Sequence, residues 1–151
     1  MRATPDIASI LSDVALAAKA FWGYPRRWLI HWRDDLTLTP DFIRKHPVYA
    51  AMTSGEVAGF YAIAGQDTRW ALEHFWVRPQ SMGQGIGPAL FDHAVWQLRT
   101  MQAELLLIES DPNAEGFYRH MGARQIGLVI HRLEGQPRML PLLIFDVQQS
   151  E

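Results

Sequence analysis

The chain has 151 residues, 48% of them hydrophobic, and a formal net charge of −2 at pH 7. This composition predicts a single domain over residues 1–151, and the weak net charge argues against nucleic acid or an anionic membrane as a partner. There is no cysteine, which excludes disulfides, thiolate nucleophiles and cysteine-ligated metals. Because no run resembles a signal peptide or a membrane-spanning helix, we expect a cytoplasmic protein with a small-molecule partner.

The first third of the chain has helical patterns. Thr4-Pro5-Asp6 places a capping residue before a proline, and apolar residues recur at helical spacing from Ile7 to Ala18. This predicts an amphipathic helix that ends near Trp22. A second helical segment is predicted over residues 26–36, and a short one begins at Thr39-Pro40.

The remainder alternates between strand-like and helical patterns. Strand-like runs occur at residues 48–53, 56–64, 70–77, 105–108, 125–130 and 140–147. Ser54-Gly55 predicts a hairpin between the first two runs. A long helix is predicted from Ile86 to Met101, and a short helix over residues 113–121. The nearly all-apolar run 105–108 predicts a parallel strand buried on both faces. Together these elements predict a mixed α/β fold with one strand–helix–strand crossover.

A glycine-rich loop, Gly83-Gln84-Gly85-Ile86-Gly87, joins the run that ends at Val77 to the long helix. Glycine permits positive φ and close approach of a ligand, and a helix N-terminus offers free N–H groups to an anion. The loop therefore predicts a phosphate cradle, with a purely structural turn as the alternative. A P-loop is excluded because no lysine follows Lys45, and a dinucleotide fingerprint fails because Pro88 and Leu90 stand where its third glycine is needed.

Two motifs occur in order around the crossover. The first is Val77-Arg78-Pro79 followed by Met82-Gly83-Gln84-Gly85-Ile86-Gly87, and the second combines Asn113, Phe117-Tyr118 and Met121-Gly122-Ala123. In this order, over roughly residues 70–127, the chain resembles the GNAT superfamily of acetyl-CoA-dependent N-acetyltransferases. It departs from that pattern at Met82, where arginine or glutamine is usual, and at Ala123, where phenylalanine is common. Pyrophosphate binding would then rest on the backbone N–H groups of residues 84–87.

The resemblance implies a mixed, mostly antiparallel sheet with one parallel βαβ crossover and helices on both faces. It implies direct transfer of an acetyl group from acetyl-CoA to a primary amine of a small molecule or peptide in a ternary complex, without a metal. Independently of the resemblance, the apolar run from Leu140 to Val147 could support a homodimer. The alternative from another class is a non-catalytic, CoA-sensing binding module with the same fold.

The resemblance also implies site residues. The backbone of Phe75, Trp76 and Val77 would bind the pantetheine arm. The other expected cofactor-binding residues are Met82, Gly83, Gln84, Gly85, Ile86, Gly87, Asn113, Phe117 and Tyr118. Tyr118 would be the acid near the sulfur, or else a core aromatic residue. Asn113 would contact the pantetheine arm, or else cap a helix.

The base that deprotonates the amine is expected to be Glu73, directly or through water, because a carboxylate in a central strand is costly unless it is paired or used. The competing base is His74, and the alternative for Glu73 is a salt-bridged or strand-end carboxylate. Glu109 and Asp111 point toward the predicted cleft, although Asp111 before Pro112 is also explained as a cap. Trp22, Tyr24, Trp28 and Trp32 line an acceptor pocket or pack in the core. The histidines at positions 31, 46, 93, 120 and 131 have no metal-ligand spacing and are predicted to be surface or structural residues.

Overall fold

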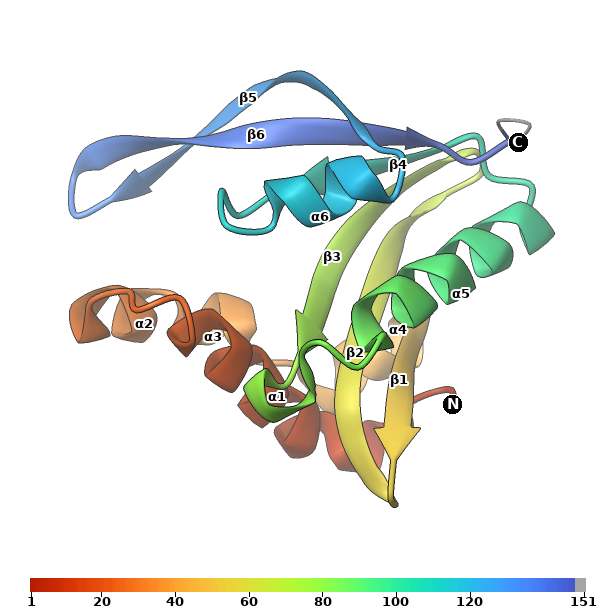
Figure 1. Cartoon of the computed structure of the whole chain (residues 1–151), viewed down its shortest axis with the longest axis horizontal. Coiled ribbons are helices and arrows are strands. Elements are labelled where there is room, and N and C mark those ends of the chain that lie inside the picture. The colour runs from red at the N-terminus through yellow and green to blue at the C-terminus, as the bar shows by residue number, and fades with distance from the viewer. Residues whose placement is uncertain (149–151) are drawn as a thin grey trace. The chain divides into compact units, whose positions relative to one another are not determined.

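In the computed structural model, which describes residues 1–148, six strands form a sheet in the order β1-β2-β3-β4-β6-β5 (Figure 1). The strands are β1 Val48–Thr53, β2 Glu56–Gln66, β3 Arg69–Val77, β4 Leu105–Glu109, β5 Arg124–Leu133 and β6 Gln136–Asp146. The helices are η1 Pro5–Ile7, α1 Ala8–Ala20, α2 Arg26–His31, α3 Arg33–Leu36, α4 Pro40–Lys45, η2 Pro79–Ser81, α5 Ile86–Thr100 and α6 Glu115–His120. β3 pairs with β4 in parallel, whereas β1–β2, β4–β6 and β5–β6 are antiparallel. The predicted mixed, mostly antiparallel sheet with one parallel crossover is confirmed.

The chain forms two compact units. The first contains Met1–Ala64 and Glu73–His93, and the second contains Gly65–Leu72 and Ala94–Glu151. β2, β3 and α5 each contribute residues to both units. No helix in residues 1–148 is both long and apolar enough to cross a membrane.

In the first unit, α1 buries one face in the core. Leu11, Val14 and Ala15 pack in one hydrophobic cluster with Val48 and Phe60 of the β1–β2 hairpin. The predicted first helix is therefore confirmed, although it ends at Ala20. The segment 26–36, predicted as one helix, divides into α2 and α3 at Trp32, whose φ of −85° and ψ of −2° lie at the edge of the helical region.

The β1–β2 hairpin confirms the turn predicted at Ser54-Gly55. Both residues have positive φ, 51° and 81°, as a two-residue type I′ turn requires. Further along β2, Gly59 permits close contact with β3. A Cβ added there would lie 2.6 Å from the Trp76 carbonyl oxygen and 3.2 Å from Val77 Cα. Glycine at this position is thus a packing requirement.

In the second unit, β4 is not buried on both faces as its sequence predicted. Leu106 and Ile108 are fully buried, whereas Leu105 and Leu107 are only half-buried. The parallel register with β3 covers three residue pairs, from Arg69↔Leu105 to Ala71↔Leu107, and the other edge of β4 pairs with β6. A run of apolar residues therefore does not by itself indicate burial of both faces.

The last two strands are longer than their apolar runs predicted. β5 and β6 form one long hairpin (Figure 1), and its turn is Glu134-Gly135, with φ of 55° and 76°. Charged residues such as Arg132 and Arg138 lie inside these strands. Arg132 is exposed, whereas Arg138 is half-buried and lies 4.0 Å from Asp111. The short helix predicted over residues 113–121 is present as α6, and Gly122 follows it with the positive φ of 108° expected after a helix end.

Candidate active site

The glycine loop lies in the first unit, between η2 and α5. Gly83 and Gly85 have φ of 80° and 81°, and a Cβ added to either would meet nothing within 4 Å. The first helical hydrogen bond of α5 runs from Ala89 N–H to the Gly85 carbonyl, 3.2 Å. The N–H groups of Ile86 and Gly87 precede that bond, so the helix itself does not use them. The loop has the positive φ values and the open space that a cradle needs.

Arg78, inside the Val77-Arg78-Pro79 motif, secures the strand end that leads into the loop. Its backbone N–H donates to the Ala58 carbonyl at 2.8 Å, and its Nε donates to the Val57 carbonyl at 2.6 Å. Both contacts anchor the end of β3 to β2. The sequence predicted no role for the Arg78 side chain, because a hydrogen bond to a backbone carbonyl far away in the chain leaves no local sequence pattern.

The β3 residues of the site point in different directions. The Phe75 ring contacts Phe91 of α5, with centroids 6.3 Å apart. His74 lies on the other side, against the rings of Phe42 and Phe60, and its Nδ1 accepts a hydrogen bond from Trp76 Nε1 at 3.0 Å. Burial lowers the pKa of His74 to about 4. His74 therefore stays neutral near neutral pH and is a weak proton acceptor.

Glu73 is exposed, and within residues 1–148 no hydrogen bond or ion pair is formed by its carboxylate. The expected cost of a buried carboxylate does not apply, because this side chain keeps its contact with solvent. No described residue forms a salt bridge with Glu73, so the salt-bridged alternative is not supported either. Glu73 remains accessible to a ligand, and its role as base stays a prediction.

Tyr118 lies in the second unit, buried on α6 beside Phe117, whose ring centroid is 5.3 Å away. Burial raises the pKa of the Tyr118 hydroxyl, and the negative charge of Asp111 raises it further. The hydroxyl therefore stays protonated and can donate a hydrogen bond across the working pH range. The Tyr118 ring also packs as a core aromatic residue. A place in the core and a role as hydrogen-bond donor therefore do not exclude each other.

The loop after β4 is built around Asp111. Its Oδ1 accepts hydrogen bonds from the Asn113 backbone N–H at 2.8 Å and from Asn113 Nδ2 at 3.0 Å. The Ala114 N–H donates to the Asp111 carbonyl at 2.9 Å, and Ala114, not Asn113, caps α6. Asn113 is exposed in this loop. Its predicted cap role is therefore wrong, because Asp111 organises the turn, and its predicted contact with the cofactor stays untested.

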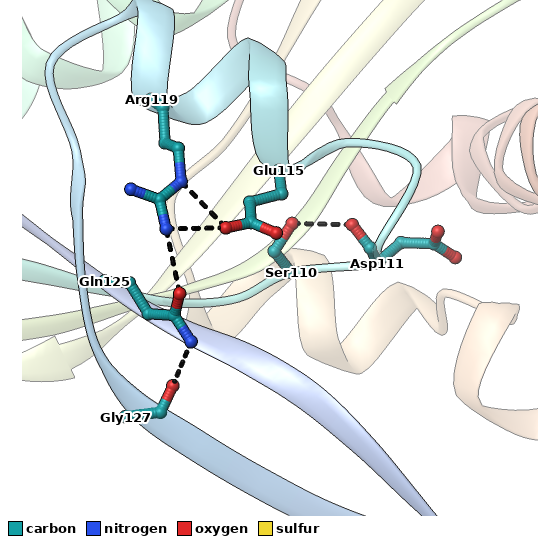
Figure 2. A network of polar contacts seen from close by, with 6 residues as sticks. All are labelled: Ser110, Asp111, Glu115, Arg119, Gln125 and Gly127. Carbon is teal, nitrogen blue, oxygen red and sulfur yellow. Dashed lines mark hydrogen bonds and ion pairs between the residues drawn. The ribbon is translucent and has the colours of Figure 1, made fainter.

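A polar network anchors α6 to the start of β5 (Figure 2). Arg119 donates to Glu115 Oε2 at 2.7 Å and to Gln125 Oε1 at 2.8 Å, and Gln125 Nε2 donates to the Gly127 carbonyl at 3.0 Å. On the other side of the helix start, Ser110 Oγ donates to the Asp111 carbonyl at 2.7 Å. These contacts hold both ends of the segment that carries Tyr118.

Two basic side chains on the β5–β6 hairpin face the acidic end of β4. His131 Nε2 lies 3.1 Å from Glu109 Oε1, and an Arg138 guanidinium nitrogen lies 4.0 Å from Asp111 Oδ2. The Arg138–Asp111 pair is largely shielded, with side chains 19% and 10% exposed. His131 was expected to be a surface or structural residue, and its carboxylate partner was missed because the register of the hairpin determines it.

Three of the four aromatic residues predicted for an acceptor pocket form a cluster in the first unit. The rings of Tyr24, Trp28 and Trp32 lie 5.0 to 5.9 Å from one another. Lys19 Nζ lies 4.4 Å from the Trp32 centroid and 5.1 Å from that of Tyr24, a cation–π arrangement that the sequence did not predict. Trp22 instead contacts Phe21.

The predicted site residues thus fall in two groups. Glu73, Phe75 to Val77 of β3 and the glycine loop belong to the first unit, whereas Asn113, Phe117 and Tyr118 belong to the second. Residues 1–148 contain no group of three His, Asp or Glu side chains arranged to hold a metal ion.

Residues 39–132, more than half of the chain, match the model of the acetyltransferase (GNAT) domain family. Over 91 residues the chain is 30% identical to the peptidyl-lysine N-acetyltransferase YjaB of Salmonella typhimurium strain LT2. That match covers 60% of this chain and 59% of YjaB, so the chain spans less than two thirds of the length of this relative.

Solved structures with the same fold include a GCN5-related N-acetyltransferase from Rhodopseudomonas palustris, with a TM-score of 0.82 and 16% identity over 97% of this chain and 93% of that one. The PaiA N-acetyltransferase of Thermoplasma acidophilum, solved in complex with coenzyme A, has a TM-score of 0.74 and 13% identity over 97% and 96% of the two chains. At these identities the similarity shows a shared fold.

Proposed function

This chain belongs to the GNAT acetyltransferase family, and on that basis we propose that it transfers an acetyl group from acetyl-CoA to a primary amine. The observation that carries the proposal is the loop before α5. Gly83 and Gly85 both have positive φ and open space in front of them, directly before a helix of 15 residues. Such a junction binds the phosphates of a nucleotide cofactor through backbone N–H groups.

Cofactor binding is proposed to depend on backbone groups more than on side-chain charge. Met82 supplies no cation, and Gln84 Nε2 is directed to the Gln80 carbonyl at 3.4 Å. The N–H groups of residues 84–87 and the helix dipole would then hold the pyrophosphate. The backbone of Phe75, Trp76 and Val77 is proposed to bind the pantetheine arm, and Asn113, Phe117 and Tyr118 are also proposed to bind the cofactor.

The chemistry needs a proton acceptor for the amine and a donor for the departing sulfur. Tyr118 supports the second role, because its hydroxyl stays protonated. Glu73, exposed on β3, or a water that it holds is the acceptor that the sequence predicts. His74 is a poor competitor, since desolvation lowers its pKa and its Nδ1 already accepts from Trp76 Nε1.

The acceptor is proposed to be a primary amine on a small molecule or a peptide. YjaB is a peptidyl-lysine N-acetyltransferase, which makes the lysine side chain of a peptide the first acceptor to test. Its Nζ is a primary amine on a flexible stem, as are the amines of many small molecules.

Titration calorimetry with acetyl-CoA tests the cofactor assignment. The chain offers a matched pair of variants, because Gly85 and Gly55 both have φ of 81° and neither has an atom within 4 Å of an added Cβ. Gly85→Ala should weaken acetyl-CoA binding at least about 10-fold, since a distorted loop misplaces its N–H groups. Gly55→Ala carries the same backbone strain in the β1–β2 turn and should leave binding unchanged. Equal affinities for both variants would show that the loop is not the cradle.

Turnover is tested by release of free thiol from acetyl-CoA in the presence of a lysine peptide, spermidine and an N-terminal alanine peptide. Tyr118→Phe removes one hydroxyl and should lower the rate about 10- to 100-fold while acetyl-CoA affinity stays within about two-fold. Saturable binding without thiol release in any mixture would instead support the CoA-sensing module. Failure to bind acetyl-CoA would overturn both functions.

A further inference from the structure

The β5–β6 hairpin of the second unit carries apolar side chains that remain exposed. Leu128, Ile130 and Met139 are 51%, 65% and 54% exposed. The register places Ile130 directly opposite Met139, and Leu128 lies two residues from Ile130 on the same strand. Because side chains alternate between the two faces of a sheet, these three residues share one face. We call them the hairpin patch.

The face that carries the hairpin patch is buried further along β6. Leu143 and Phe145 follow Met139 with the same two-residue period, and both are buried. Figure 1 shows the turn end of the hairpin extending past α6, another element of the second unit. The apolar face thus continues into a part of the hairpin where its side chains are exposed. Contiguous exposed apolar side chains on a protein surface mark interaction sites.

The strand that carries most of the patch also lies at the edge of the sheet. The strand order ends at β5, whose neighbour within residues 1–148 is β6. In an antiparallel pair, alternate residues turn their backbone N–H and C=O groups toward the partner strand and away from it. About half of the ten residues of β5 therefore direct these groups toward the outer side of the sheet. Such a row of backbone groups is a template for pairing with another chain.

We infer that β5 pairs with β5 of a second copy of this chain, antiparallel and about a two-fold axis at Val129. The pairing continues the sheet from one copy into the other and brings the two hairpin patches together. The inference does not depend on the proposed acetyl transfer. It also differs from a dimer through the apolar run 140–147, because β6 already pairs with β4 on one side and with β5 on the other.

The position of the axis follows from the side chains. Pairing about Val129 sets Leu128 opposite the partner's Ile130, and Ile130 opposite the partner's Leu128, so apolar residues meet twice. An axis at Ile130 would instead set Leu128 opposite an arginine, the partner's Arg132. An axis at Leu128 would extend the pairing into the bulge of β5, where the register shifts between Gln125 and Gly127. Cross-strand apolar pairs stabilise a sheet, which favours the axis at Val129.

The charges of the hairpin favour a copy of the same chain over a charged partner. Arg124 lies 3.5 Å from Asp146, and Arg138 lies 4.0 Å from Asp111. Two of the basic side chains are therefore balanced by acidic groups of their own chain. The other two charges, Arg132 and Glu134, are close together near the turn and have opposite signs. A surface that is balanced in this way neither attracts nucleic acid or an acidic peptide nor repels its own copy.

The size of the interface predicts a dimer that depends on concentration. A strand of ten residues extends about 33 Å. Stable dimers bury about 800 Å² on each partner, and one strand edge with three apolar side chains lies at the low end of that scale. We therefore expect the dimer fraction of the wild type to rise over about 1–300 µM protein.

Sedimentation velocity over this range tests the inference with two variants of the patch. Leu128→Glu and Ile130→Lys each set a charge opposite an apolar side chain of the partner, and each should raise the dimer dissociation constant at least about 100-fold. Both positions are exposed in the single chain, so thermal midpoints should stay close to that of the wild type. Ile30→Lys is the matched control, since Ile30 of α2 is 64% exposed, and it should leave the dimer unchanged.

Mixing the two variants tests the register itself. In an equal mixture of the Leu128→Glu and Ile130→Lys chains, pairing about Val129 sets the new carboxylate of one chain opposite the new ammonium of the other. The mixture should therefore form a 1:1 dimer, although each variant alone is monomeric. A mixture that stays monomeric would contradict the pairing about Val129. A wild type that is monomeric up to about 300 µM would overturn the inference and leave the patch to a partner of another kind, and a dimer that survives both substitutions would overturn it as well.

Discussion

His74 makes the stability of the fold depend on pH in the acid range. Its ring lies against Phe42 and Phe60, and Trp76 Nε1 donates to its Nδ1. Burial lowers the pKa of His74 from 6.5 to about 4. Between these two values the unfolded chain binds a proton that the folded chain does not. The stabilisation from the neutral ring is therefore complete above the ordinary pKa and is lost as pH falls toward about 4.

The magnitude follows from the size of the shift. The two pKa values differ by about 2.5 units, and at about 1.4 kcal/mol per unit the full effect is about 3 kcal/mol. Between about pH 7.5 and about pH 5 the same relation removes about 2 kcal/mol from the free energy of unfolding. This is a large share of the roughly 5–15 kcal/mol that stabilises a domain of ordinary size.

Urea unfolding followed by tryptophan fluorescence measures the effect in the wild type and in His74→Gln. The glutamine amide oxygen can still accept from Trp76, but it does not titrate. The wild type should lose about 2 kcal/mol more than the variant between about pH 7.5 and about pH 5. His120→Gln controls for the loss of a histidine as such. A stability difference between wild type and His74→Gln that is constant over this interval would refute the reasoning.

Two further predictions concern packing in the first unit. Gly59→Ala should cost about 1–3 kcal/mol, because its Cβ would lie 2.6 Å from the Trp76 carbonyl oxygen and the strands would have to move. An unchanged thermal midpoint would contradict this. Tyr61→Phe should cost about 1 kcal/mol, since the buried hydroxyl lies 2.7 Å from His93 Nδ1. If urea unfolding of that variant matches the wild type, the hydrogen bond adds no net stability.

The elements with a strong periodic pattern were predictable from sequence. The first helix and the long helix after the glycine loop follow from the spacing of apolar residues, and their predicted ends agree with the structure to within a few residues. The turn at Ser54-Gly55 follows from turn chemistry. The positive φ values of Gly83 and Gly85 were also predictable, because glycine adopts that conformation at little cost. The glycine half of the candidate site could therefore be predicted from local sequence.

Features that depend on long-range register were not predictable. The final strands were expected to be short, because Arg132 and Arg138 interrupt the apolar pattern; Arg132 is exposed, and Arg138 lies near Asp111. His131 and Glu109 are 22 residues apart, and only the pairing of β4, β6 and β5 brings them together. The exposure of Glu73 was missed for a related reason, since burial of one position in a strand depends on which neighbours cover it.

The turn at Glu134-Gly135 sets which residues of β5 and β6 face each other. Both residues have positive φ, although Glu134 is not a glycine. The conformation of this two-residue turn fixes the register of the two long strands. A change of turn type would carry His131 away from Glu109 without altering either side chain. Natural variation at these two positions is thus a route by which relatives could gain or lose this pair without any change in the side chains that form it.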